Sequence, residues 1–197
     1  MTRTAVYFAG MAALIVATGM TIGSIAMPKW ISYSVTDPSG DAVYDSIGLH
    51  QRCTSANKTC SPFPEEGRCE GEGRSFCNMW RTAGFLMNFV AIVELAAIAG
   101  FIVIGSGGKV KRQDGWKVLG SMSVVVAVVQ FATMAVVAYM FDHDDLFLVP
   151  GYRLGSAWYI CMFSAAIALL CAFGLAISAY VLPPEDGYQF LNDPSRV

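Results

Sequence analysis

The sequence predicts a mainly α-helical membrane protein whose helices form an antiparallel four-helix transmembrane bundle. Hydrophobic residues make up 55% of the 197 residues and charged residues only 14%, and the mean hydropathy is +0.50, so too few polar groups are present to cover a soluble globule. The apolar residues also form four stretches without runs of charge. Each reaches the roughly 20 residues that cross a bilayer as a helix. The stretches are 5–27, 82–106, 118–140 and 154–182.

The first stretch has two interpretations. Ser24-Ile25-Ala26 has the small residues of a signal-peptidase site, which would make the stretch a cleaved signal peptide. Its apolar run is long for a signal peptide, however, and Arg3 is the only charge before it. We therefore expect a retained first transmembrane helix.

The segment 107–117 between the second and third stretches predicts the orientation of the chain. Its basic residues outnumber its single acid, Asp114, and short loops rich in Lys and Arg stay in the cytoplasm. Both termini, with the tail 183–197, are then cytoplasmic, and the loops 28–80 and 141–153 lie outside. We expect residues 1–197 to form one domain in the plasma membrane. The basic residues are Lys109, Lys111, Arg112 and Lys117.

The first outer loop has the composition of an extracellular segment. It holds four cysteines and the sequon Asn57-Lys58-Thr59, which suit an oxidising compartment and predict N-glycosylation at Asn57. Residues 30–35 alternate large and small side chains, 37–40 supply turn chemistry and 42–53 form a second extended run, so we expect an antiparallel hairpin. A loop of this size buries little core by itself, so disulfides are needed to hold it.

Four cysteines allow three pairings, among which the sequence does not choose. We favour Cys53 with Cys60 and Cys69 with Cys77, because these pairs close short loops. The alternative is a zinc site built from His50, Cys53 and two later cysteines, but the spacings lack the CxxC knuckle of structural zinc sites. We expect no cofactor, no metal and no nucleic-acid partner, since no nucleotide or nucleic-acid motif is present.

The loop also carries a set of residues that is typical of one family. Trp30 follows the first helix, Gly48-Leu49 stands four residues before Cys53, a further cysteine follows, and Arg81 opens the second helix. This set resembles the claudin, epithelial-membrane-protein and peripheral-myelin-protein superfamily. The resemblance implies a left-handed antiparallel four-helix bundle with a small extracellular antiparallel β-sheet formed by the first outer loop. It further implies that Cys53 is disulfide bonded and that Trp30 packs beside Leu49 at the membrane rim.

The chain departs from the family pattern at several positions. His50 replaces the tryptophan of Gly-Leu-Trp, the first two cysteines stand close together, and Cys69 and Cys77 are additional. The layout is also similar to claudin-like plasma-membrane proteins of fungi, whose roles concern membrane domains, cell-wall integrity and mating. At the C-terminus, Ser195-Arg196-Val197 fits the loose pattern of a PDZ-type contact through Ser195 and Val197.

Two polar residues stand near the middle of apolar stretches. Glu94 and Gln130 predict either a proton or ion pathway or a protonated glutamate bonded across the bundle, and we favour the second interpretation. Gly19 and Gly23 form a GxxxG step. We expect this step to serve close packing inside the bundle rather than dimerisation.

No arrangement of nucleophile, base or metal ligands predicts catalysis, so we expect that the protein is not an enzyme. The leading hypothesis is a claudin-like integral membrane protein that organises membrane or cell-surface contacts through lateral self-association and its disulfide-stapled outer loop. The alternative is an auxiliary subunit that modulates or traffics a channel or other membrane complex. A third hypothesis is a conduit in which Asp41, Asp45 or Glu65 selects cations.

Overall fold

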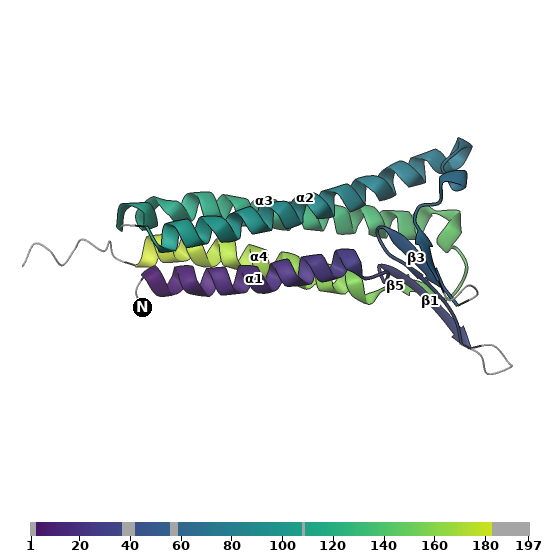
Figure 1. The fold of residues 1–197 in the computed structure, drawn as a ribbon, viewed down its shortest axis with the longest axis horizontal. Helices are drawn as coiled ribbons and strands as arrows, with labels where there is room; N and C mark the ends of the chain where they lie inside the picture. The colour runs from purple at the N-terminus through teal and green to yellow at the C-terminus, as the bar shows by residue number, and fades with distance from the viewer. Residues whose placement is uncertain (1–2, 37–41, 56–58, 108, 183–197) are drawn as a thin grey trace, which may run out of the picture.

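Four long helices dominate the computed structural model, which describes residues 3–36, 42–55, 59–107 and 109–182. They are α1 (Arg3–Ala26), α2 (Arg74–Gly105), α3 (Lys109–His143) and α4 (Ser156–Val181). The helices lie side by side along the long axis of the molecule, and a small sheet lies at one end (Figure 1). Each helix packs against two neighbours, so that α1, α2, α3 and α4 close a ring. All four are long and apolar enough to cross a membrane.

Two helices extend beyond the apolar stretches that predict them. α2 begins at Arg74 and α3 at Lys109, before the predicted spans 82–106 and 118–140. The reason is that hydropathy locates the part of a helix that suits lipid, whereas the backbone hydrogen bonds continue through polar turns as well. No glycine or proline interrupts residues 74–81, so nothing local ends α2 earlier.

The sheet is antiparallel, with the strand order β4-β3-β2-β1-β5. The predicted hairpin is present, because β1 (Ile31–Thr36) pairs with β2 (Ala42–Ile47). Two details of the prediction are wrong. The run 42–53 is divided at Gly48 into β2 and β3 (Gln51–Thr54), and the first outer loop does not form the sheet alone, because β5 (Tyr152–Leu154) from the second loop pairs with β1. The edge strand next to β3 is β4 (Cys60–Pro62).

A continuous apolar core joins the sheet to the bundle. Trp30, Ile31 and Ile47 from the sheet region pack with Trp80 of α2 and Met140 of α3, and all five are less than 2% exposed. Helix α4 reaches the same core at Ala157, Cys161 and Ala165. Because this core contains residues of the sheet and of the helices, the sheet and the neighbouring ends of the helices form one packed unit.

Candidate functional site

The motif residues Trp30, Gly48 and Leu49 anchor the sheet on the end of the bundle, and we call these three residues the tryptophan seat. The Trp30 ring is fully buried, and its Nε1 donates a hydrogen bond of 2.7 Å to the carbonyl of Ser24 in the last turn of α1. Leu49 is 2% exposed, and its carbonyl accepts a 3.2 Å hydrogen bond from Nε1 of Trp80. Two buried tryptophans thus use their one polar atom to satisfy backbone carbonyls where a helix ends and a strand begins.

Gly48 is required at its position by close contact between backbones. A Cβ there would stand 2.6 Å from Cα of Pro28, closer than any side-chain carbon can approach. Its amide donates to the carbonyl of Gln51 at 2.8 Å, which closes the tight connection from β2 to β3. The Gly-Leu pair therefore turns the chain against the end of α1 and places Leu49 in the core.

The cysteines form two disulfides, Cys53–Cys60 and Cys69–Cys77, which are the pairs expected from the short loops. The first joins a register pair of β3 and β4, and the second joins the segment before α2 to its first turn. Cys53 is therefore unavailable as a zinc ligand. The sequon Asn57 and the C-terminal Ser195 and Val197 lie outside the described residues.

Arg81 and His50 do not join the tryptophan seat. Arg81 is exposed, and the contact found for it within the described chain is a 4.0 Å approach of Nη2 to Sγ of Cys69. His50, which replaces the third residue of the family motif, stands between β2 and β3 and packs against the surface of α2. Its Nε2 is 3.4 Å from Nδ2 of Asn88, and its ring would be 3.2 Å from a Cβ added at Gly84.

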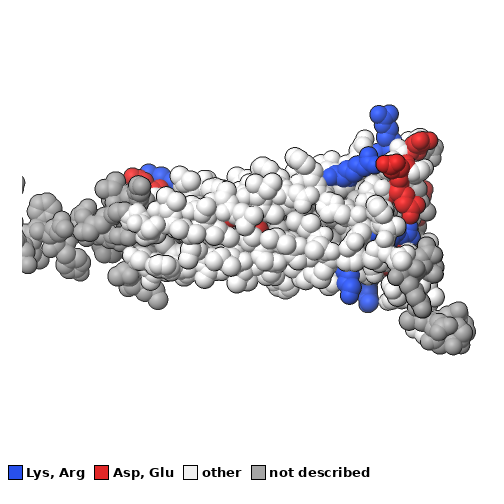
Figure 2. Space-filling view, viewed as in Figure 1, with Lys and Arg blue, Asp and Glu red and all other residues white. Residues whose placement is uncertain are grey.

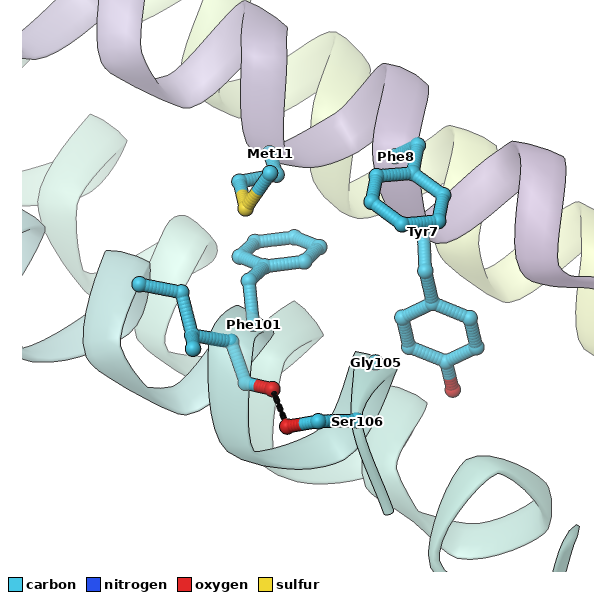
Figure 3. Close-up of a pocket in the computed structure, with 7 residues that line it drawn as sticks. Tyr7, Phe8, Met11, Phe101, Gly105 and Ser106 are labelled. Atoms are coloured by element: carbon cyan, nitrogen blue, oxygen red, sulfur yellow. Dashed lines mark hydrogen bonds between the residues drawn. The ribbon is translucent and has the colours of Figure 1, made fainter. Parts of the chain in front are cut away.

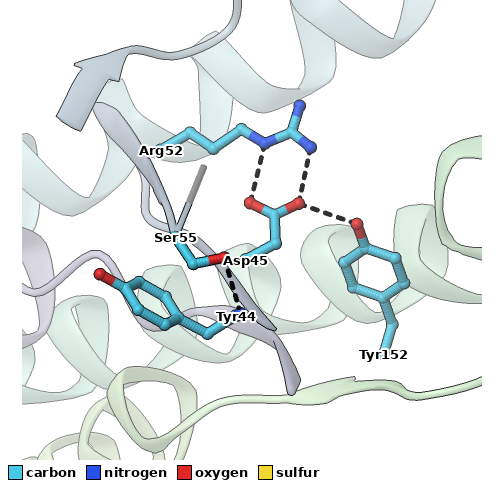
Figure 4. A network of polar contacts seen from close by, with 5 residues as sticks. All are labelled: Tyr44, Asp45, Arg52, Ser55 and Tyr152. Atoms are coloured by element: carbon cyan, nitrogen blue, oxygen red, sulfur yellow. Dashed lines mark hydrogen bonds and ion pairs between the residues drawn. The ribbon is translucent and has the colours of Figure 1, made fainter. Parts of the chain in front are cut away.

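The outer ion-pair cluster comprises Asp45 of β2, Arg52 of β3 and Tyr152 of β5 (Figure 4). Arg52 binds the Asp45 carboxylate in a bidentate manner, through Nε at 2.9 Å and Nη2 at 2.6 Å, and the Tyr152 hydroxyl donates to Oδ2 at 2.8 Å. The hydrogen bond to Asp45 raises the pKa of Arg52. Burial, with the same carboxylate next in importance, raises the pKa of Tyr152 to about 12.

This cluster was not predicted from the sequence, and it bears on the conduit hypothesis. Asp45 is 8% exposed, and both of its carboxylate oxygens accept hydrogen bonds within the sheet, which argues against its selecting cations. Asp41 lies outside the described residues, and Glu65 is exposed. The sequence did contain a signal for this cluster. Alternation along the strand places Asp45 on the same face as the core residue Ile47, and an acid on a buried face needs a polar or charged partner.

The bundle cluster comprises one polar residue from each helix: Thr21, Glu94, Gln130 and Ser164, all 0% exposed. Thr21 Oγ1 lies 3.0 Å from Glu94 Oε1 and 2.8 Å from Ser164 Oγ, and Gln130 Nε2 donates to both hydroxyl oxygens, at 2.8 and 3.2 Å. The predicted link between Glu94 and Gln130 therefore runs through Thr21 rather than directly. The apolar pattern locates the four helices along the sequence, but it does not determine their relative heights in the bundle.

Counting protons in the bundle cluster favours a neutral Glu94. Together with the bond from Ser164 to the Ala17 carbonyl there are five contacts, whereas the Thr21 and Ser164 hydroxyls and the Gln130 amide supply only four protons. A carboxyl proton supplies the fifth. Glu94 Oε2 also has no hydrogen-bond partner within the described chain, which an ionised carboxylate in an apolar bundle tolerates poorly.

The GxxxG step does not lie in the packed interior. Gly19 is exposed, and a Cβ added at Gly19 or Gly23 would meet nothing within 4 Å. The expectation of close packing inside the bundle at this step is therefore wrong. The interior of α1 is lined instead by Leu14, Ala17 and Thr21, all 0% exposed.

An apolar cleft of about 250 Å³ opens between α1 and α2 at the end of the bundle opposite the sheet. Figure 3 shows Tyr7, Phe8 and Met11 of α1 facing Phe101 and the last turn of α2. The Ser106 hydroxyl donates to the carbonyl of Ile102, so this polar group serves the helix end. The cleft offers hydrocarbon contact and little hydrogen bonding.

Four long apolar helices with a disulfide-stapled sheet at one end thus define the class of fold. No family model and no curated protein matches the sequence.

Proposed function

We propose that the chain is a claudin-like four-pass protein of the plasma membrane, with both termini in the cytoplasm and the sheet outside. In this proposal it organises membrane or cell-surface contacts by associating with copies of itself through the outer region. The seat formed by Trp30, Gly48 and Leu49, with Cys53 in a disulfide, supports the family resemblance. The seat makes the sheet a rigid extension of the bundle, as a contact surface requires.

The surface of the bundle supports insertion into a bilayer. Large apolar side chains point outward along its length, among them Phe85 and Leu170, each 69% exposed, and Ile92, 65% exposed. The space-filling view shows a largely uncharged surface along the helices, with most of the visible acidic and basic side chains at the end that carries the sheet and a few at the opposite end (Figure 2). A lipid environment accounts for such a surface, because hydrocarbon replaces the water that these side chains avoid.

The observation that carries the proposed function is the outer apolar patch, which we define as Val35, Val43, Leu148 and Val149. These residues lie outside the four helices and are 44%, 45%, 66% and 53% exposed. Val35 and Val43 face each other in the register of β1 and β2, and Leu148 and Val149 precede β5, which flanks β1. In the proposed orientation these side chains lie beyond the four spans and outside the core, and exposed apolar groups of this kind mark protein contacts.

The double substitution Leu148→Ser with Val149→Ser tests this proposal. Burying one such side chain in a contact contributes about 1.5 to 3 kcal/mol, so we expect self-association in native membranes to weaken by at least roughly tenfold. Cross-linking in intact cells, followed by sizing and mass spectrometry in mild detergent, measures it. Glu66→Ser, an exposed change elsewhere in the outer region, is the control and should leave association unchanged.

Two results would contradict the proposal. One is unchanged self-association in the double variant, with normal amounts at the cell surface. The other is wild-type protein that purifies with one foreign channel or transporter subunit in fixed stoichiometry and without self-oligomers. That second result would favour the role of an auxiliary subunit instead.

A further inference from the structure

A groove of about 860 Å³ lies between one face of the sheet and the outer ends of α1 and α4. Strand alternation divides the sheet into two faces, and register partners share a face. Ser32, Ser46 and Arg153 are register partners across β1, β2 and β5, and they line the groove. The opposite face carries Ile31 and Asp45 and belongs to the core and the outer ion-pair cluster. The groove therefore lies mainly on the face away from the core, and Tyr33 in its lining packs against Tyr152 of the outer ion-pair cluster, with the ring centroids 4.9 Å apart.

The groove is basic. Its lining contains two cations, Lys29 and Arg153, and no acid. Both cations are exposed, and neither pairs with an acid among the described residues. Most of the remaining lining residues carry a neutral hydroxyl group, among them Ser34, Ser46 and Tyr44, although the lining surface as a whole is mainly apolar. Figure 2 shows basic side chains above and beneath the end of the molecule that carries the sheet, whereas the acidic side chains visible there gather on its upper side.

The groove also lies at the depth of lipid headgroups if the helices span a bilayer as proposed, and the inference rests on that part of the proposed function. Lys29 follows the end of α1 at Ala26, and Arg153 precedes the start of α4 at Ser156. Tyr159, in the first turns of α4, lines the groove and is 48% exposed. A half-exposed tyrosine next to cations at the end of an apolar span is typical of the interface between hydrocarbon and headgroups.

We propose that this groove binds the headgroup of an anionic phospholipid of the outer leaflet. Its phosphate lies between Lys29 and Arg153, and the hydroxyl groups of Ser34 and Ser46 contact a polyol headgroup. The start of α4 at Ser156 adds the positive end of a helix dipole on the same side. A zwitterionic headgroup fits less well, because its ammonium group finds no acid in the lining. The sheet overhangs this lipid and holds it against α1 and α4.

Lipid retention by the purified full-length protein tests the proposal. The protein is reconstituted in phosphatidylcholine nanodiscs with a minor fraction of phosphatidylglycerol, and native mass spectrometry counts the lipids that stay bound. We expect wild-type protein to retain phosphatidylglycerol preferentially. Each basic residue near a membrane surface changes the affinity for anionic lipid roughly fivefold, so Lys29→Gln with Arg153→Gln should lower the preference roughly 25-fold. Arg74→Gln, an exposed cation of the outer end on α2 that does not line the groove, is the matched control.

The outcomes separate the alternatives. Loss of the preference in the double variant alone supports the groove, whereas an unchanged preference, or an equal loss in Arg74→Gln, overturns it. Displacement of bound phosphatidylglycerol by inorganic phosphate at comparable concentration would also overturn it, because the site would then hold a free anion rather than a lipid. Self-association measured on the same samples reports on the proposed function separately, and its failure with retained lipid preference would leave the groove standing.

Discussion

Two polar clusters tie distant parts of this chain together, and they use different chemistry. The outer ion-pair cluster joins β2, β3 and β5 by a bidentate ion pair and a phenol. The bundle cluster joins all four helices by hydroxyl, amide and carboxyl groups, and its proton count favours a neutral acid. Each contains one carboxyl group that the surrounding structure encloses, so the comparison isolates the effect of the environment on that group.

The difference follows from access to water. In the outer cluster the side chains of Arg52 and Asp45 keep 18% and 11% of their surface exposed, so part of the hydration of each ion survives folding. In the bundle cluster every member is 0% exposed and, in a membrane, hydrocarbon surrounds the helices. Ionised groups are costly there unless fully paired, and neutral hydrogen bonds avoid that cost. The outer cluster therefore links its strands through charged groups, whereas the bundle cluster links the helices through neutral hydrogen-bonding groups.

The largest expected effect is at Asp45. Asp45→Asn keeps the shape of the side chain but removes the charge, which leaves the partly buried guanidinium of Arg52 without its counter-ion. We expect the free energy of unfolding to fall by about 2 to 3 kcal/mol, measured by unfolding of the purified protein in mixed micelles with increasing dodecyl sulfate.

Asp114→Asn is the matched control for this measurement. Its carboxylate also forms an ion pair, with Lys117 at 2.9 Å, but both side chains are more than 60% exposed. Such pairs contribute less than about 0.5 kcal/mol. Equal losses in the two variants would contradict the account of the outer cluster, since burial would then make no difference.

The next effect is a loss of stability at alkaline pH. The folded-state pKa of Tyr152 is about 12, above its ordinary value of 10.0, so folding favours the protonated phenol. This stabilisation is complete below pH 10 and is lost as the pH rises through about 12. Arg52 does not oppose this trend, because its hydrogen bond to Asp45 raises its pKa further above its ordinary value.

Tyr152→Phe therefore has a defined signature. We expect it to cost about 1 kcal/mol at neutral pH, the contribution of one hydrogen bond, and to remove part of the stability loss between pH 10 and about 12. Thermal unfolding followed at several pH values checks both. A pH profile identical to that of the wild type would mean that Tyr152 does not titrate with folding.

The sequence predicts the helices well because each is a local pattern, and it predicts the hairpin and short disulfide loops for the same reason. It does not predict β5, since the three residues Tyr152–Leu154 are too few for alternation to stand out. The outer cluster depends on that strand, which brings Tyr152 to Asp45 from 107 positions away. Such contacts depend on how the second loop returns to the sheet, and no local pattern records that.

The bundle cluster was predicted in part. The position of Glu94 and Gln130 in the middle of apolar stretches indicates that they face the interior. Their partners Thr21 and Ser164 could not be chosen, because many small hydroxyl residues lie in these helices and the choice depends on relative helix height. The groove lined by Lys29 and Arg153 was missed for a similar reason, since two loops distant in sequence form it.

The smallest expected effect is the most informative for the comparison. Glu94→Gln makes the same exchange of carboxyl for carboxamide as Asp45→Asn, but a carboxamide supplies N–H protons and no charge is lost from a neutral acid. Membrane hydrogen bonds contribute about 0.6 kcal/mol each, so we expect a change below that value. Glu94→Leu, which removes the hydrogen bonds but keeps an apolar side chain of similar length, should cost more than Glu94→Gln. If Glu94→Gln instead lost as much stability as Asp45→Asn, the bundle carboxyl would act as a charge, and the proposed division between a charged outer cluster and a neutral inner one would fail.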